Sequence, residues 1–230
     1  MSIPEPSISY VNESAILLSF GAPGQAGEAA QPDQSLQIRI CQLAQALRGA
    51  PGSAQMLLEV VPGPGNLLLV MQREVIAEQV LQQAEALWLD LEQTRETPAL
   101  IEIPVCYGGK GGPDLPQLSR HTGLDVNDII DRHCAPEYLV QCLGFMAGFA
   151  YLGGLDPSLA IARKKTPAAR IPAGSVAIGG LYTGIYPSAT PGGWHIIGQT
   201  RSRLFDPLAS PPCLLRPGDR LRFVAVETLS

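Results

Sequence analysis

The chain has 230 residues, of which 46% are hydrophobic and 16% are charged, and its formal net charge at pH 7 is -5. This composition is typical of a soluble globular protein, long enough for one large domain or two small ones. The acidic balance argues against a nucleic-acid-binding stripe, which needs clustered excess Lys and Arg. The first ten residues lack the basic and apolar regions of a signal peptide, and no run reaches the roughly 18 apolar residues of a membrane span. We therefore expect a cytoplasmic protein that binds neither nucleic acid nor membrane.

Residues 1–95 predict a small α+β domain, a two-layer sandwich of order ββαββα. The predicted elements are two short strands within 8–20, a helix at 34–48, strands at 54–61 and 66–72, and a helix at 73–93. Gly49 stands where a glycine would end the first helix, and residues 22–34 are predicted to be a loop. No residue in this domain suggests chemistry, so we expect a binding or packing role. The polar, Pro-containing segment 94–99 predicts the domain boundary.

A second domain is predicted over residues 100–230, beginning with a strand at 101–107. The glycine cluster at 108–115 partly resembles a phosphate-binding loop, but it lacks the spacing of that loop and the Ser or Thr after Lys110 that would hold magnesium. We interpret it as a tight turn. Asp125 is predicted to cap a helix at 126–134. His133 falls on the apolar face of this helix, which favours a hydrogen-bonded core histidine.

The stretch from 144 to 194 is unusually rich in Gly and Pro, and we interpret it as a loop-built pocket on a β scaffold. Short runs at 174–180, 194–200 and 220–226 alternate with turns at spacings typical of a barrel. Polar or charged side chains that could serve chemistry here are Tyr151, Asp156, Arg163, Lys164, Ser175, Thr183 and Tyr186. The short basic cluster at 163–165, with Arg170, either binds a small anion or is a solvated loop.

Serine, histidine and cysteine are the other residue types that could serve chemistry. Ser175 lacks the G-x-S-x-G elbow of a nucleophile, so a hydrogen-bond donor to a ligand is the better interpretation. Strand alternation predicts that His195 is exposed and that Trp194 lies in the core or forms a pocket wall. The five cysteines form an odd set without a CxxC pair, which predicts free, buried thiols and no disulfide or zinc site. We expect no metal site made by protein ligands alone.

Ordered motifs across residues 100–226 resemble the family of 5-oxoprolinase B subunits, also called allophanate hydrolase subunit 1 or sporulation kinase inhibitor-like proteins. The matching segments are PVCYGGKGGPDL (104–115), GFMAGFAYLGGL (144–155), IPAGSVAIGG (171–180), TGIYP (183–187), PGGWHIIG (191–198), LFDP (204–207) and LLRPGD (214–219). The resemblance implies that the second domain is a cyclophilin-like β-barrel carrying the pocket. His133, Glu137 and Tyr138 also match a family pattern, which adds a ligand-binding or relay role to the alternatives for His133.

The resemblance implies one subunit of an ATP-dependent 5-oxoprolinase, which opens 5-oxo-L-proline to L-glutamate after phosphorylation and whose B subunit is inactive alone. The expected partners are a C subunit, similar to allophanate hydrolase subunit 2, and a lactam-hydrolysing A subunit. ATP and its magnesium ion would be shared with a partner. The expected catalytic residues are Arg163 and Lys164, and the expected substrate-binding residues are Phe145, Tyr151, Ser175, Thr183, Tyr186 and His133. The glycines expected to form the pocket backbone are Gly148, Gly174, Gly184, Gly192 and Gly193.

Departures from the family pattern leave the substrate open. Ala147 and Ala162 stand where the family has Pro, Lys164 and Ala168 where it has Arg, Tyr182 where it has Gln, and Gln199 where Arg is frequent. Lys cannot reproduce the bidentate clamp of a missing guanidinium. Two alternatives therefore stay open: a member of the urea-degrading branch, serving allophanate hydrolysis or carboxyl transfer, and a non-catalytic inhibitor of a sensor histidine kinase.

Overall fold

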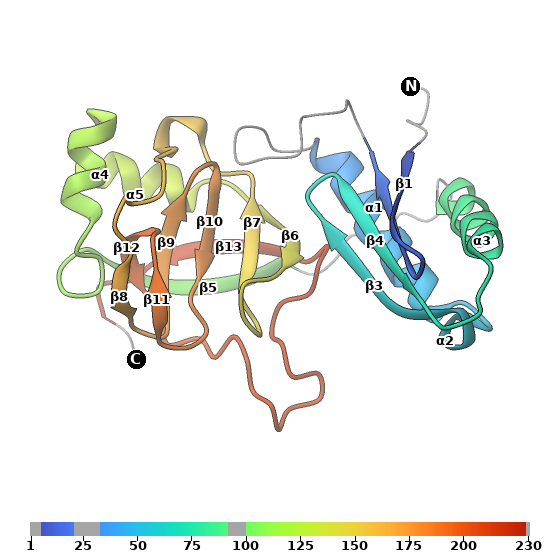
Figure 1. Ribbon diagram of the computed structural model, residues 1–230. Helices are drawn as coiled ribbons and strands as arrows, with labels where there is room; N and C mark the ends of the chain where they lie inside the picture. The colour runs from blue at the N-terminus through green and yellow to red at the C-terminus, as the bar shows by residue number, and fades with distance from the viewer. Residues whose placement is uncertain (1–5, 21–32, 92–99, 229–230) are drawn as a thin grey trace. The chain divides into compact units, whose positions relative to one another are not determined.

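The computed structural model describes residues 6–20, 33–91 and 100–228. The chain divides into two compact units, Met1–Thr97 and Pro98–Ser230 (Figure 1). The predicted linker at 94–99 and most of the predicted loop at 22–34 lie outside the described residues. Within the described part of the chain, no helix is long and apolar enough to cross a membrane.

The first unit is a four-stranded antiparallel sheet with helices, as the predicted ββαββα pattern requires. Its elements are β1 (Ser7–Asn12), β2 (Ala15–Ser19), α1 (Gln34–Gly49), α2 (Ser53–Met56), β3 (Leu57–Gly63), β4 (Asn66–Met71) and α3 (Ala77–Asp90). The strand order is β1-β2-β4-β3. Alternating residues of β2 and β4 join apolar residues of α1 and α3 in one core, as period 2 and period 3.6 dictate.

The ends of three predicted elements in this unit were wrong. Helix α1 includes Gly49 as its last residue, and the next residue, Ala50, is extended because a proline follows it. Gly52, at a φ of 78°, then starts the short helix α2, so β3 begins only at Leu57. Helix α3 begins four residues later than predicted because Glu74 has a φ of 65°, which is incompatible with a right-handed helix.

The second unit is built on a closed seven-stranded barrel of order β10-β7-β6-β13-β5-β12-β9, which confirms the predicted barrel. Its elements are β5 (Leu100–Tyr107), α4 (Leu115–Thr122), α5 (Val126–Cys134), β6 (Tyr138–Leu143), β7 (Ala150–Gly153), the 3₁₀ helix η2 (Pro157–Leu159), β8 (Ala168–Ile171), β9 (Ser175–Gly179), β10 (Tyr182–Ile185), β11 (Thr190–Gly192), β12 (His195–Gln199) and β13 (Arg220–Ala225). Strands β8 and β11 form a separate two-stranded sheet.

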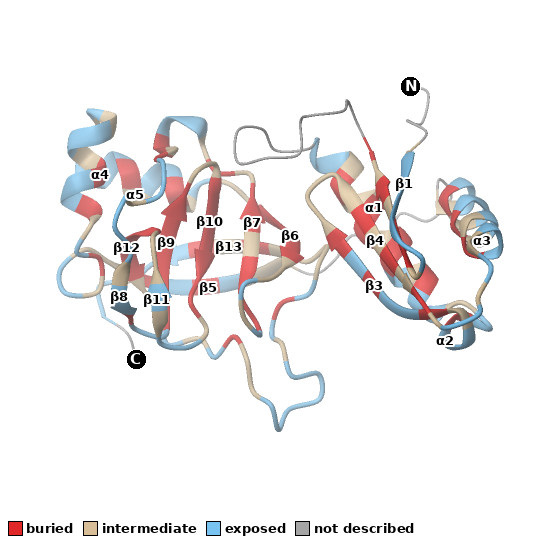
Figure 2. Cartoon of the chain, in the orientation of Figure 1, coloured by how far each residue is buried: buried red, intermediate tan, exposed pale blue. Residues whose placement is uncertain are grey.

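The stretch from 144 to 194 is more regular than predicted, since it contains strands β7 to β11. Strands β9 and β10 are buried along their whole length, as Figure 2 shows. They are buried on both faces because the barrel core covers one face and a cluster of aromatic side chains covers the other. The glycines are needed for this close packing, so glycine content alone was a poor guide to loops.

The glycine cluster at 108–115 is the predicted turn, and it leads into helix α4. The Gly112 amide donates to the Gly108 carbonyl at 2.8 Å. Helix α5 begins where predicted, because the Asp125 carboxylate accepts the amides of Asn127 and Asp128 at 2.7 and 3.0 Å. Five free cysteines are confirmed, although only Cys41 and Cys142 are fully buried.

Candidate functional site

A hollow of about 500 Å³ opens on the barrel unit between α4, the segment 161–166 and β12. We call it the basic hollow; its lining residues are Gln117, His121, Ile161, Ala162, Arg163, Lys164, Lys165, Thr166 and His195. The structure thus brings both predicted catalytic cations, Arg163 and Lys164, to one surface depression. No group of three or more His, Cys, Asp and Glu among the described residues could hold a metal ion there or elsewhere.

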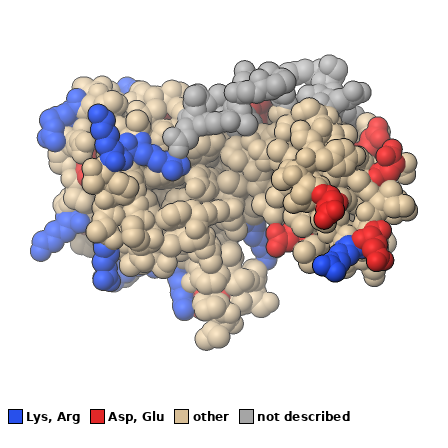
Figure 3. Space-filling view, in the orientation of Figure 1, with Lys and Arg blue, Asp and Glu red and all other residues tan. Residues whose placement is uncertain are grey.

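Charge is distributed unevenly between the two units. Residues up to Thr97 include four basic and eleven acidic side chains, and those from Pro98 include twelve basic and ten acidic, together the sixteen and twenty-one of the chain. In Figure 3, Lys and Arg predominate on the visible face of the barrel unit, and Asp and Glu predominate on that of the first unit. An anion is therefore attracted to the barrel unit rather than to the first unit.

Asp114, directly before α4, holds Lys164 and with it the segment 161–166, which we call the basic segment. Its Oδ2 accepts from the Lys164 ammonium at 2.6 Å and from the Ile196 amide at 2.7 Å. The Lys164 amide also donates to the Gly193 carbonyl at 2.7 Å. Sequence reasoning assigned Asp114 no role, although an acid directly before a helix in the GGPDL motif was the available signal. The Lys164 charge is thus already paired, and its catalytic role stays a prediction.

Replacing Asp114 with alanine should lower the free energy of unfolding by about 2 to 3 kcal/mol. The reason is that the buried Ile196 amide loses its side-chain acceptor and the Lys164 ammonium its counter-ion. Asp114→Asn keeps an oxygen for the amide and loses only the ion pair, so we expect a loss of about 1 kcal/mol. Urea denaturation measures both. Equal stability of Asp114→Ala and the parent chain would show that Asp114 is not an anchor of this segment.

Arg163 lies beside Lys164 at the edge of an aromatic cluster. Its guanidinium carbon is 6.0 Å from the centroid of the Trp194 ring, at the limit of a cation–π contact. Trp194 is 5% exposed and packs edge-on against Phe149 at 5.4 Å, which confirms that it belongs to the core. The Arg163 side chain therefore lies next to the aromatic cluster that contains Trp194.

His195 was predicted to be exposed, and this was wrong: it is 3% exposed. Segment 161–166 folds over the end of β12, and the His195 Nε2 lies 3.0 Å from the Ala162 carbonyl oxygen. Burial lowers the pKa of His195, while the bond to Ala162 and the charge of Asp114 oppose that shift. Because a carbonyl only accepts, Nε2 carries the hydrogen of the neutral ring. Nδ1 then has a lone pair and no hydrogen-bond partner among the described residues.

The predicted substrate-binding aromatics differ in their access to solvent. Phe145 is 62% exposed and has a φ of 65°, an uncommon conformation for a residue with a side chain. Tyr151 is half-buried, and Tyr186 is buried beneath Phe145, at 6.4 Å between ring centroids. Phe145 is thus the outermost ring of the three, and it is the one best placed for direct contact with a ligand. Strained backbone of this kind is frequent at binding sites.

His133, Ser175 and Thr183 lie in the interior of the barrel unit, each at most 2% exposed. His133 Nδ1 is 2.7 Å from the Tyr107 hydroxyl, and its Nε2 is 2.9 Å from Thr183 Oγ1. Thr183 donates its hydrogen to the Ala177 carbonyl at 3.0 Å, so His133 Nε2 is the donor to Thr183. His133 is therefore a hydrogen-bonded core histidine, as its helix face indicated. Ligand contact by these three residues stays a prediction, and it would require the core to open.

The predicted pocket glycines mostly face protein atoms. If these glycines carried a Cβ, that atom would lie less than 3.0 Å from a neighbouring atom at four of the five. The neighbours are Phe205 for Gly148, the Thr200 carbonyl for Gly174, the Ala150 carbonyl for Gly184 and the Tyr186 hydroxyl for Gly192. Gly193 differs, because its nearest neighbour would be the Lys164 carbonyl oxygen at 3.6 Å. Packing thus accounts for four of the five glycines, and Gly193 is the one with free space beside the basic segment.

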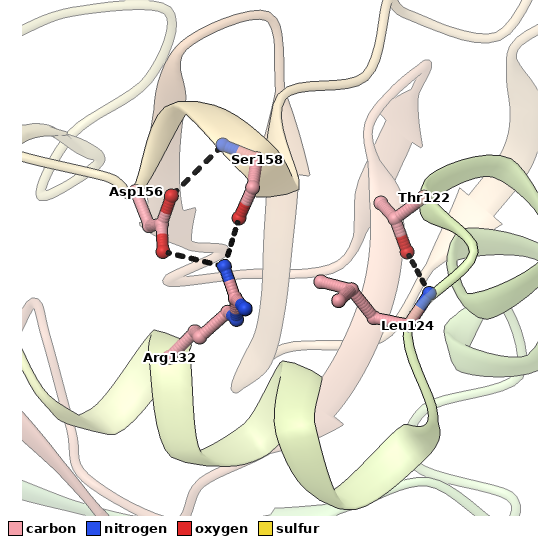
Figure 4. Close-up of polar contacts among 5 residues, drawn as sticks. All are labelled: Thr122, Leu124, Arg132, Asp156 and Ser158. Carbon is pink, nitrogen blue, oxygen red and sulfur yellow. Dashed lines mark hydrogen bonds and ion pairs between the residues drawn. The ribbon is translucent and has the colours of Figure 1, made fainter.

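Asp156, a predicted candidate for chemistry, joins η2 to α5. Its carboxylate accepts the Ser158 amide at 2.9 Å and lies 3.5 Å from the Arg132 guanidinium, which also donates to the Ser158 hydroxyl at 3.1 Å (Figure 4). The bond from the Ser158 amide is the largest cause that lowers the pKa of Asp156. In the same view, Thr122 accepts the Leu124 amide where α4 ends. Asp156 is accounted for by this structural cap.

The residues that depart from the family pattern fit the fold without strain. The Tyr182 hydroxyl donates to Gln141 Oε1 at 3.3 Å inside the core, and burial raises its pKa to about 12. Gln199 donates to the Ala173 carbonyl at 3.4 Å, and Ala168 packs partly buried against the aromatic cluster. The exposed Ala162 supplies the carbonyl that holds His195. Nothing in the structure explains Ala147.

Comparisons with known proteins agree with this architecture over nearly the whole chain. The model of the carboxyltransferase domain, subdomain C and D, matches residues 6–215. The B subunit of 5-oxoprolinase from Escherichia coli O157:H7 is 40% identical over 215 residues, which cover 93% of this chain and 93% of that protein. The crystal structure of TTHA0988 has a TM-score of 0.75 and 36% identity over 93% of this chain, and this chain spans only 40% of that one.

A more distant structure shares the fold alone. The urea carboxylase of Kluyveromyces lactis has a TM-score of 0.67 at 19% identity, covering 97% of this chain and 22% of that one. Matches of this extent define the class, which is the carboxyltransferase-type pair of subdomains C and D. Within that class the chain belongs to the family of 5-oxoprolinase B subunits.

Proposed function

We propose that the chain is the B subunit of an ATP-dependent 5-oxoprolinase, inactive alone, which works with a C subunit and a lactam-hydrolysing A subunit in the cytoplasm. The observation that carries this proposal is the 40% identity with a 5-oxoprolinase B subunit over 93% of both chains. The alternatives in the urea-degrading branch and in kinase inhibition rest on no comparable observation.

The chemistry explains why an ATP-dependent enzyme would need a basic hollow. A lactam is a poor electrophile, and transfer of the γ-phosphoryl group to its oxygen releases ADP and activates the ring carbon. Water then adds to that carbon and the ring C–N bond breaks, which gives an acyl phosphate; a second water cleaves this acyl phosphate to L-glutamate and inorganic phosphate. Phosphoryl transfer needs cations and N–H donors around the moving charge rather than covalent help. Arg163 and Lys165, both at the surface of the hollow, would supply such charge, and magnesium would arrive with ATP.

Replacing Arg163 with alanine should lower turnover of the reconstituted complex at least about tenfold, because one cation next to the transferring group is lost. Glutamate formation from 5-oxoproline and ATP, with this chain copurified with its partner subunits, measures the effect. Arg203→Ala is the matched control, since Arg203 lies on an exposed loop paired with Asp206. Full activity of Arg163→Ala would overturn the assigned role. Omitting this chain should abolish turnover.

Testing urea and allophanate in the same assay separates the family branches. Turnover of 5-oxoproline alone supports the proposal. Turnover of urea or allophanate instead would assign the chain to the urea-degrading branch. A stable complex that turns over none of the three would mean that the scaffold has been kept and the substrate has changed.

A further inference from the structure

The floor of the basic hollow contains a buried side chain that the proposed reaction does not use. His195 is 3% exposed and lines the hollow, and its Nδ1 has no hydrogen-bond partner among the described residues. Leaving a buried polar atom unsatisfied costs about 1 to 3 kcal/mol. Such atoms are rare in folded proteins and often face a ligand or water.

The walls of the hollow are fixed before any ligand arrives. The Ile161 carbonyl accepts the Gly180 amide at 2.8 Å, and the Ala162 carbonyl is held by His195. Lys164 is tied at its amide to Gly193 and at its ammonium to Asp114. A loop held at so many points presents its cations in a fixed geometry, which reduces the entropy lost on binding.

The charges around His195 come from two elements, helix α4 and the segment 161–166. Asp114 and His121 lie at the two ends of α4, and Lys164 lies on the segment that covers the ring; of these, only Asp114 favours the imidazolium. Arg163 and Lys165 line the same hollow, and no ion pair of Lys165 occurs among the described residues. With Lys164 neutralised by Asp114, the hollow has an excess of positive charge that an anion would balance.

We propose that the basic hollow binds the phosphoryl group of a small-molecule ligand, and that Lys165 and His195 recognise it. Protonation of Nδ1 turns this unpaired acceptor into a donor aimed at a phosphate oxygen, so His195 takes up a proton as the anion binds. Once protonated, the ring donates a charge-assisted hydrogen bond to a phosphate oxygen and so gains the partner that Nδ1 lacks. This inference deepens the proposed function, since it assigns the phosphoryl group of the nucleotide to this chain.

Titration of the isolated chain with ATP and with inorganic phosphate tests the proposal. Only three histidines occur in the sequence, so isotope-labelled side chains allow His195 to be followed by NMR. We expect the His195 signals to shift towards the imidazolium on binding. We also expect affinity to increase by up to about tenfold for each unit by which pH falls across the titration of His195. Tighter binding of ATP indicates a nucleotide as the source of the phosphate, and equal binding indicates free phosphate; both support the site.

Variants locate the site. Lys165→Ala should weaken binding about tenfold. His195→Gln keeps a donor for Ala162 but lacks Nδ1, so it should bind more weakly and lose the pH dependence. The matched control is Lys110→Ala, an exposed lysine of the glycine turn outside the hollow, which should bind normally.

Three results would overturn the proposal: no histidine shift at millimolar ligand, unchanged binding by Lys165→Ala, or loss of binding in Lys110→Ala. Because binding is measured without partner subunits, it is independent of turnover. An active complex in which this chain binds no phosphate would refute this inference alone. Phosphate binding in a chain that supports no turnover would instead refute the proposed function.

Discussion

Gly174→Ala is expected to lower the free energy of unfolding by more than about 4 kcal/mol, enough to leave little folded protein. Gly174 has a φ of 79°, where a side chain is strained, and its Cβ would overlap the Thr200 carbonyl oxygen. The overlap cannot be relieved by a rotamer, because the neighbour is backbone. Gly174 also donates to the Tyr186 carbonyl at 2.7 Å and accepts the Thr200 amide at 2.8 Å. Soluble yield and thermal unfolding measure the loss.

Gly193→Ala is the matched comparison for this glycine. Both residues were predicted to form the pocket backbone, but the new methyl group at Gly193 meets the Lys164 carbonyl only at 3.6 Å. We expect its melting temperature to stay close to that of the parent chain. Lower turnover by a stable Gly193→Ala would place Gly193 against a ligand. A Gly174→Ala chain that folds normally would contradict the packing explanation of the glycines.

Acid should destabilise the barrel unit through His133. Burial lowers the pKa of His133 from 6.5 to about 3. Between these two values the unfolded chain binds a proton that the folded chain does not, so stability falls as pH falls through this window. The expected slope from this residue is about 1.4 kcal/mol for each pH unit. Tyr107 already donates to Nδ1, so a proton there would also break that hydrogen bond.

Urea denaturation at several pH values measures this slope. His133→Gln should have a lower free energy of unfolding than the parent chain near neutral pH. When pH falls from about 6.5 to about 4.5, however, the free energy of unfolding of His133→Gln should decrease by about 2 kcal/mol less than that of the parent chain. The matched control is His121→Gln, because His121 is exposed and lies outside the barrel core. Equal slopes for the parent chain and His133→Gln would refute a neutral buried His133. Carboxylates with a lowered pKa, such as Asp156, take up protons and destabilise the fold only at lower pH.

The elements that could be predicted are those whose signals are local. Helix α5 has its cap at Asp125 and its apolar face within nine residues, so neither depends on the rest of the chain. Helix α1 likewise shows helical spacing over about four turns. The barrel strands were found as short apolar runs between turns, although the name of the fold came from the resemblance. Helix α4 was missed because it is eight residues long and buries only Leu115 and Leu118, too few for a visible period.

The features that could not be predicted depend on contacts between distant residues. His195 bonds the carbonyl of Ala162, which lies 33 positions earlier in the sequence, and Asp114 pairs with Lys164, which lies 50 positions later. Gln37 lies on the apolar face of α1, where its side chain bonds the Gly63 carbonyl at 3.1 Å and the Gly65 amide at 2.8 Å. A sequence pattern records polarity at each position, but not the partner that makes a buried polar group stable.

The position of β13 has a consequence for how the barrel unit is made. This strand pairs in parallel with β5 and antiparallel with β6, so it separates two strands that lie much earlier in the chain. While the chain leaves the ribosome, β5 and β6 present unpaired edges until residues 220–225 have been synthesised. Closure of the ring therefore has to wait for residues 220–225, and it joins strands of high contact order. Such open edges attract other strands, so partners or chaperones that bind early would protect the nascent chain.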